Sequence, residues 1–196
     1  MIDARTIAFY DTAAERYATL TDTGQPSDDL RAFMAALPAG AQVLDLGCGP
    51  GLASFHMAKA GLRSDPVDAS RAMVDHARGL GLPARLGTFD DLDAVDVYDG
   101  VWANFSLLHA PAADLPRHLA AIARALRPGG LFHAGMKTGT GEARDALDRR
   151  YTYVTADGWD RLLRDAGFSP VFAREGVDKG CAGTDDAYLV TRARKS

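Results

Sequence analysis

The stretch VLDLGCGPG, Val43 to Gly51, decides the fold of this chain. It begins as an apolar strand around Asp45, continues into a turn with three glycines in five positions, and leads into a helix-compatible segment. Glycine has no side chain to keep a ligand away from the backbone, and it adopts backbone angles closed to other residues. The stretch therefore predicts a strand, turn and helix that cradle a ligand with main-chain atoms.

Apolar periodicity predicts the remaining elements. Helices are expected at 6–20, after a Ser27 cap, at 52–60, after a Ser70 cap, at 113–126 and after a Thr155 cap. Strands are expected at 42–46, up to Asp68, and at 84–88, 100–105, 131–136, 171–174 and 187–191, with a turn at 176–186. Pro66 suggests that the second strand pairs poorly at that point. The segment 137–154 has weak periodicity and is expected to be a loop or an irregular helix over the site.

Strands that alternate with helices predict an α/β fold, a doubly wound and mostly parallel sheet with helices on both faces. The length of 196 residues and 47% hydrophobic content favour a single domain, with N-terminal helices at 1–38 and a core at 39–196. A net charge of −4 without a basic run makes nucleic acid an unexpected partner, and no apolar run suggests a membrane. Cys48 and Cys181 stand far apart, as expected for reduced thiols in a cytoplasmic protein.

Two details indicate which ligand the turn binds. Asp68 closes the second strand 17 positions after Gly51, where a carboxylate accepts hydrogen bonds from both ribose hydroxyls. A dinucleotide fingerprint would need glycine at position 52, which is Leu52, and Asp45 would repel a pyrophosphate but suit a cation. A nucleoside cofactor other than NAD is therefore expected.

VLDLGCGPG, together with LRPGG at 126–130, resembles the class I S-adenosylmethionine-dependent methyltransferases, of the small-molecule kind related to the ubiquinone-biosynthesis C-methyltransferases. The resemblance implies a Rossmann-like sheet of seven strands whose last strand is antiparallel. It also implies a set of cofactor contacts, with the methionine portion near the first four and the ribose at Asp68: Asp45, Gly47, Cys48, Gly49, Asp68, Ala69, Met73, Thr88, Phe89, Asn104 and Phe105. Thr88 stands where the family often has an acid that meets the adenine.

Further residues are implied around the reacting methyl group. Tyr10 and Tyr17, in the phrase FYDTAAERY, match a helix that many small-molecule members lay over the cofactor, although the rings could equally pack on the body. The chain lacks the Asn-Pro-Pro-Tyr type signature of members that methylate adenine or glutamine nitrogens. S-adenosylmethionine, no metal ion and a small-molecule methyl acceptor are therefore expected, in a monomer or homodimer.

His109 is the best-placed general base, just beyond the fourth strand, and the alternative is that it caps or packs against the next helix. The other four histidines suit surface or packing roles. Lys137, Arg149, Tyr151 and Tyr153 are expected to contact the acceptor, or else to belong to an ordinary solvated loop. The rival functions are a nucleotide-cofactor oxidoreductase of the same fold class and a non-catalytic module that binds the cofactor without turnover.

Overall fold

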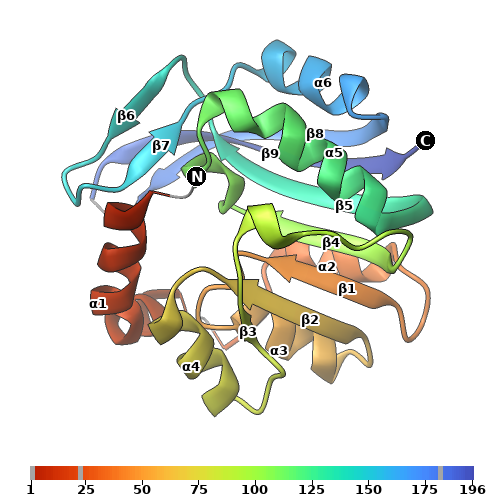
Figure 1. Ribbon diagram of the computed structural model, residues 1–196, viewed down its shortest axis with the longest axis horizontal. Helices are drawn as coiled ribbons and strands as arrows, with labels where there is room; N and C mark the ends of the chain where they lie inside the picture. The colour runs from red at the N-terminus through yellow and green to blue at the C-terminus, as the bar shows by residue number, and fades with distance from the viewer. Residues whose placement is uncertain (1–2, 22–23, 181–182) are drawn as a thin grey trace.

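The structure, a computed structural model, describes residues 3–21, 24–180 and 183–196. A seven-stranded sheet in the order β3-β2-β1-β4-β5-β9-β8 forms its centre (Figure 1). The strands are β1 Gln42–Leu46, β2 Arg63–Asp68, β3 Arg85–Leu86, β4 Tyr98–Asn104, β5 Leu126–Lys137, β8 Phe168–Lys179 and β9 Asp185–Lys195. Strand β9 is antiparallel to both of its neighbours, and the β1, β2, β3, β4 and β5 ladders are parallel. The predicted doubly wound, mostly parallel sheet with an antiparallel last strand is confirmed.

Helices cover both faces of this sheet. They are α1 Ala4–Thr21, α2 Asp28–Ala35, α3 Leu52–Lys59, α4 Arg71–Gly79, α5 Leu115–Ala125 and α6 Ala156–Asp165. Helix α5 lies in front of the sheet in Figure 1 and α2 lies behind it. The predicted caps Ser27, Ser70 and Thr155 are confirmed, since each side chain accepts a hydrogen bond from a backbone amide in the first helical turn.

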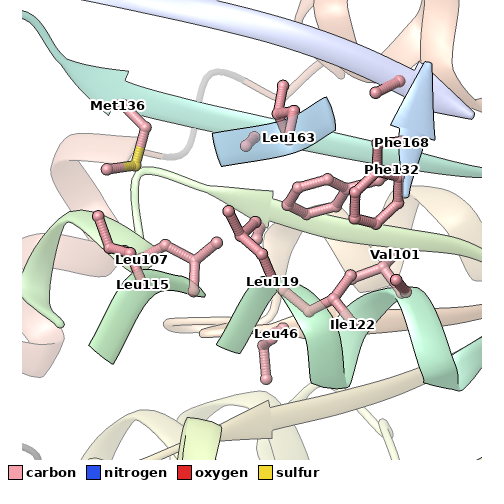
Figure 2. Packing of buried hydrophobic residues seen from close by; sticks show 14 of the residues in the cluster. Leu46, Val101, Leu107, Leu115, Leu119, Ile122, Phe132, Met136, Leu163 and Phe168 are labelled. Carbon is pink, nitrogen blue, oxygen red and sulfur yellow. The ribbon is translucent and has the colours of Figure 1, made fainter. Parts of the chain in front are cut away.

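The alternation of side chains along β4 explains why it is the central strand. Val101 is buried in the cluster under α5 and α6, and Figure 2 shows Leu119 and Ile122 of α5 on the same side as Val101. Trp102 points to the other face and packs with Phe33 of α2, ring centroids 5.2 Å apart. Because β4 is buried on both faces, its sequence is apolar at nearly every position.

The segment 137–154 is not the loop or irregular helix that was expected. It forms an antiparallel hairpin of β6 Glu142–Arg144 and β7 Arg150–Thr152. Strands of three residues are too short to show a period of two, so the sequence pattern could not reveal them. The Thr152 hydroxyl donates to the carbonyl of Ala110 at 2.6 Å, which fixes the hairpin beside the end of β4.

Several strand boundaries also differ from the prediction. Strand β5 begins at Leu126 rather than 131, because Leu126 already pairs with Tyr98 of β4. Strands β8 and β9 extend to Lys179 and from Asp185, so the turn between them is shorter than the predicted 176–186. The end of β8 near this turn is exposed, and the segment is rich in glycine and aspartate, so it shows no alternating strand pattern. Cys181 lies outside the described residues, while Cys48 is a free, buried thiol.

Pro66 does not disturb the ladder between β1 and β2, where Asp45 is paired with Pro66 in unbroken register. The carbonyl of Val67 points to β1, accepting amides of the glycine turn, and the carbonyl of Asp68 points to β3. By alternation, the Pro66 nitrogen faces the β3 side, where pairing begins only at Val67. The missing N–H is therefore lost where no partner strand exists.

Candidate active site

The backbone amides of the glycine turn at 47–51 donate hydrogen bonds to acceptors within the protein. Its first two amides both donate to the carbonyl of Val67, at 2.8 and 2.9 Å, and the amide of Gly49 donates to Asp68 Oδ2 at 2.8 Å. The fourth residue is proline and has no N–H, and the last amide donates to the carbonyl of Cys48 at 3.1 Å. A pyrophosphate needs free amides at such a turn. The four amides of this turn are bonded within the protein, and the exclusion of NAD stays a prediction.

Two of the three glycines are required by neighbouring protein rather than by a ligand. Gly47 has φ +81°, and a Cβ there would lie 2.3 Å from the Cβ of Ser106. Gly51 has φ +91°, and its Cβ would lie 2.8 Å from that of Ala77 in α4. Only Gly49 faces open space, with the ring of Tyr17 at 3.9 Å from a Cβ built there. The turn is therefore held closely against the end of β4 and against α4.

Asp68 connects the turn to α4. Its Oδ2 accepts from Gly49 and its Oδ1 accepts from the amide of Ser70 at 2.8 Å. Burial raises the pKa of this carboxyl above its usual value. Each carboxylate oxygen retains a second lone pair, and Asp68 lines a cleft. The side chain is thus oriented by backbone amides and still has acceptor capacity on the cleft side.

The cleft lies between the glycine turn, α1, α4 and the end of β4, and it encloses about 740 Å³ with its open mouth. Twelve of the residues named from the sequence line it: Tyr10, Tyr17, Gly47, Gly49, Asp68, Ala69, Met73, Thr88, Phe89, Asn104, Phe105 and His109. Six further lining residues were missed: Thr6, Ile7, Leu46, Ser70, Gly87 and Ser106. Thr6 and Ile7 stand one helical turn before Tyr10, so helical spacing could have found them.

Three residues named from the sequence do not line a cleft. Asp45 is 1% exposed, accepts the Ser54 hydroxyl at 2.8 Å, and has a pKa that burial raises to about 7. The Cys48 thiol is buried behind the turn, and burial raises its pKa. Tyr153 packs beside Gly139, with its ring centroid 6.3 Å from that of Tyr151. Asp45 therefore supports the turn from behind, and its contact with a cofactor stays a prediction that this arrangement does not favour.

Thr88 takes part in a local cap rather than facing the cleft with a free hydroxyl. Its hydroxyl donates to Asp91 Oδ2 at 2.9 Å and accepts from the amide of Asp90 at 3.2 Å. The ring of the next residue, Phe89, meets His118 edge-on at 5.4 Å. Adenine contact at these two positions stays a prediction.

A second cleft, of about 1080 Å³ with its mouth, joins the first. Both clefts are lined by the same five residues: Tyr10, Tyr17, Asn104, Phe105 and His109. Lys137, Arg149 and Tyr151 line the second cleft, and Lys137 Nζ lies 2.7 Å from Asp186 Oδ2 and 3.8 Å from the centre of the Tyr151 ring. The wall formed by β8 and β9, including Arg174 and Tyr188, was missed because only the folded sheet brings it here.

His109 and Tyr10 meet where the two clefts join. His109 Nδ1 lies 2.7 Å from the carbonyl of Arg150, which only accepts, so Nδ1 carries the proton in the neutral ring. Nε2 is then the acceptor for the Tyr10 hydroxyl at 2.9 Å. Desolvation, with the charges of Arg149 and Lys137, lowers the pKa of His109 to about 4. The imidazole is therefore neutral at physiological pH, with its basic nitrogen bonded to Tyr10.

A comparison with known proteins agrees with this geometry. Residues 43–130 match the family model described as a methyltransferase domain. The chain superimposes with a TM-score of 0.74 on the crystal structure of Burkholderia thailandensis 1,6-didemethyltoxoflavin-N1-methyltransferase with bound 1,6-didemethyltoxoflavin and S-adenosylhomocysteine. The two share 26% identity over 98% of this chain and 88% of the other. The segment 43–130 is thus a methyltransferase domain, and the fold of the chain is that of the class I S-adenosylmethionine-dependent methyltransferases.

Curated relatives of this chain are named for several reactions. The 27-O-demethylrifamycin SV methyltransferase of Amycolatopsis mediterranei (strain S699) is 29% identical over 81% of this chain and 65% of its own length. The ubiquinone biosynthesis O-methyltransferase of Xanthomonas axonopodis pv. citri (strain 306) is 30% identical over 65% and 61%. The chain spans from 36 to 65% of the length of these first curated relatives.

His133 makes a contact that the sequence did not suggest. His133 stacks on Trp102, ring centroids 3.7 Å apart, and its Nε2 lies 3.0 Å from Asn104 Oδ1. Because an amide oxygen only accepts, Nε2 carries the proton and Asn104 directs its NH₂ group elsewhere. His133 therefore orients a residue that both clefts share.

Two searches of the described ranges, 3–21, 24–180 and 183–196, found nothing. No helix there is long and apolar enough to cross a bilayer. No cluster of three or more histidine, cysteine or acidic side chains there has the arrangement of a metal site.

The residues of the first cleft fit S-adenosylmethionine. The amides of the turn donate to protein acceptors, which suits a ligand without phosphate. Asp68 can still accept hydrogen bonds from ribose hydroxyls. Gly49 leaves the space in front of the turn open up to the ring of Tyr17. An aromatic ring face attracts a cation such as a sulfonium.

Proposed function

We propose that the protein transfers a methyl group from S-adenosylmethionine to a small-molecule acceptor, with the cofactor in the first cleft and the acceptor in the second. The observation that carries the proposal is the shared wall of the two clefts. Tyr10, Tyr17, Asn104, Phe105 and His109 border both, so that ligands in the two clefts would meet at these side chains. A transfer reaction needs such a junction.

In this proposal the cofactor is held by residues of the glycine turn and α4. Asp68 accepts the ribose hydroxyls, and the main chain at Gly47 and Gly49 borders the methionine portion. Met73 and Phe89 offer apolar surface to the adenine. The cofactor supplies a methyl group on a positively charged sulfur, which an acceptor atom displaces in line.

The remaining residues align the acceptor, exclude water and move a proton. Tyr10 and Tyr17 come from α1, which stands at one end of the sheet between α4 and the β6–β7 hairpin (Figure 1). Asp11 Oδ1 accepts the Ser70 hydroxyl at 2.6 Å, and Asp3 pairs with Arg144 at 2.6 Å. These contacts tie α1 and the residue before it to α4 on one side and to the β6–β7 hairpin on the other, as a lid requires.

Proton transfer is assigned to His109 through Tyr10. The Tyr10 hydroxyl donates to His109 Nε2, and its oxygen also lies 3.4 Å from Arg149 Nη1. A phenolic oxygen has a further lone pair that can accept a proton from an acceptor group. As that proton arrives at Tyr10, the Tyr10 proton moves to Nε2, and the Arg150 carbonyl keeps its bond to Nδ1.

The relatives support the class of acceptor. The Burkholderia and Amycolatopsis proteins are named for small molecules, a demethyltoxoflavin and a demethylrifamycin. A net charge of −4 favours neither nucleic acid nor anionic membranes as partners. The proposal includes a cytoplasmic protein without a metal ion, acting as a monomer or homodimer.

Calorimetric titrations with S-adenosylhomocysteine and with NAD test the proposal. Binding of S-adenosylhomocysteine without binding of NAD is expected. Binding of NAD alone would favour the oxidoreductase and remove the methyltransferase function. Transfer of a deuterated methyl group to a panel of small molecules, followed by mass spectrometry, then separates an enzyme from a non-catalytic module, which would bind the cofactor but yield no product.

A further inference from the structure

Aromatic rings from four separate segments face the second cleft. Phe105 and Tyr188 meet edge-on with centroids 5.8 Å apart, and Tyr10 and Tyr17 do so at 5.6 Å. Tyr151 of β7 lies against the His109 ring at 4.9 Å. All five aromatic residues line the cleft. A flat aromatic molecule is the ligand that such walls recognise best, because ring pairs attract in stacked and edge-on geometries.

Phe105 is one of these aromatic residues, and its backbone conformation is strained. Its φ is +56°, a left-handed backbone angle that non-glycine residues rarely adopt. Its amide donates to the carbonyl of Gly135 at 3.1 Å, which holds this backbone in place. The ring is nevertheless 37% exposed, so the strained turn does not bury it in the core. It presents the ring to the space where the clefts join.

The groups around the junction also limit the chemistry of the acceptor. Arg149 lies beside Tyr10 and pairs with Asp145 at 2.6 Å. Lys137 Nζ lies over the Tyr151 ring and pairs with Asp186 at 2.7 Å, so the cationic ends of two ion pairs border the place where a proton leaves. Burial, with a smaller contribution from these two cations, lowers the pKa of His109 to about 4 and makes it a weak base. The N–H groups of the two cations can also donate to a negatively charged oxygen. An acidic hydroxyl suits this environment, and an aliphatic alcohol does not.

We propose that the acceptor is a phenol, a flat aromatic ring whose hydroxyl group faces Tyr10 and His109 and is methylated on oxygen. The inference rests on the proposed methyl transfer and deepens it. The acceptor oxygen forms a bond to the methyl carbon as the methyl–sulfur bond breaks, and that electron pair stays on sulfur. The hydroxyl proton is taken up at Tyr10 while the Tyr10 proton moves to His109 Nε2. The products are an aryl methyl ether and S-adenosylhomocysteine.

Binding provides a test that does not depend on turnover. The protein, saturated with S-adenosylhomocysteine, is titrated with 2-naphthol and with decahydro-2-naphthol, which has a similar outline without aromatic rings. We expect 2-naphthol to bind at least about tenfold more tightly. Equal affinities, or tighter binding of the saturated alcohol, would overturn the aromatic part of the inference. Failure of S-adenosylhomocysteine to bind would instead remove the proposed function itself.

A matched pair of variants locates the effect. Phe105→Leu should reduce the preference for 2-naphthol over decahydro-2-naphthol at least about threefold. Phe172→Leu is the control, since Phe172 lies on β8 outside both clefts, under Arg192 at 4.0 Å. If both variants, or neither, lost the preference for 2-naphthol, Phe105 would not be the residue that recognises the aromatic ring.

Turnover tests the hydroxyl part. The enzyme is given S-adenosylmethionine with a deuterated methyl group and a panel of 1-naphthol, 2-naphthol, 2-naphthalenemethanol, 2-naphthoate and 2-(aminomethyl)naphthalene. Aryl methyl ethers are expected from the naphthols, at a kcat/KM at least about 100-fold above that of the other three. A higher kcat/KM for the alcohol, the acid or the amine, or product from none of the five, would overturn the assignment to phenols.

Discussion

Asp68 has two roles at the site. Its carboxylate accepts hydrogen bonds from the amide of Gly49 in the glycine turn and from the amide of Ser70 at the start of α4. It also borders the first cleft. Charge-assisted hydrogen bonds from backbone amides fix its orientation before any ligand arrives. His133 does the same for Asn104 at the junction of the clefts. Preorganisation by such second contacts is what turns cleft residues into a binding site.

Replacing Asp68 tests its contact with the ribose. Asp68→Ala should weaken binding of S-adenosylhomocysteine by about 1.5–3 kcal/mol, the range for hydrogen bonds to a charged group. Isothermal calorimetry measures the change, and Asp93→Ala, an exposed residue outside the clefts, is the control. Unchanged affinity in a folded Asp68→Ala protein would remove the carboxylate from the cofactor site.

Replacing His109 tests the proton acceptor. His109→Ala should lower kcat about 100-fold or more, the usual contribution of a general base, while the affinity for S-adenosylhomocysteine changes less than twofold. Tyr10→Phe should lower kcat in the same way, since it removes the hydroxyl between acceptor and imidazole. Methyl transfer is followed by mass spectrometry, with Phe172→Leu, outside both clefts, as the control. Normal kcat in His109→Ala would show that the ring only packs.

At the scale of elements, α1 and the β6–β7 hairpin act together. Thr6 of α1 accepts the amide of Arg150 at 2.9 Å, and Asp3 pairs with Arg144 of the hairpin. The hairpin also carries Tyr151 on β7 and Arg149 between its two strands, and both residues line the second cleft. One side of the lid is therefore fastened to the wall that would receive the acceptor, and closing the lid and ordering that wall are linked.

Weakening the lid should speed cofactor release. Tyr17→Ala removes a ring that lies 3.9 Å from a Cβ built at Gly49, so the dissociation rate of S-adenosylhomocysteine should rise about tenfold. Stopped-flow displacement measures this rate. Thr19→Ala, on the exposed face of the same helix, should leave it unaltered. A normal rate in Tyr17→Ala would mean that α1 does not cover the cofactor.

For the whole molecule, two buried histidines and one buried carboxyl have opposite effects on how the free energy of unfolding depends on pH. The pKa of His109 is lowered to about 4 and that of His133 to about 3, so the unfolded chain binds more protons than the native one below the ordinary value of 6.5. Their contribution to stability is present above pH 6.5 and is lost as pH falls. Asp45 opposes this, because its raised pKa favours the folded state as pH falls from about 7.

Removing one histidine should expose this balance. In His133→Phe, the aromatic stack on Trp102 is kept but a group that must stay neutral is gone. Its free energy of unfolding relative to the wild type should therefore rise by about 2 kcal/mol between pH 7 and pH 4.5. Urea unfolding at the two pH values measures the difference. A difference that does not change with pH would show that His133 is not neutral in the folded protein.

The sequence by itself determined the order of strands and helices, the glycine turn, the position of Asp68 and the aromatic residues of α1. These follow from local periodicity and backbone chemistry, which depend on neighbours along the chain. It did not reveal the β6–β7 hairpin, the burial of Asp45 or the cleft wall at Tyr188. Only the tertiary structure decided these, and it also brought Tyr10 to His109 across 99 positions. The physical reason is that side-chain contacts between distant segments depend on how the layers pack, and no local pattern records that packing.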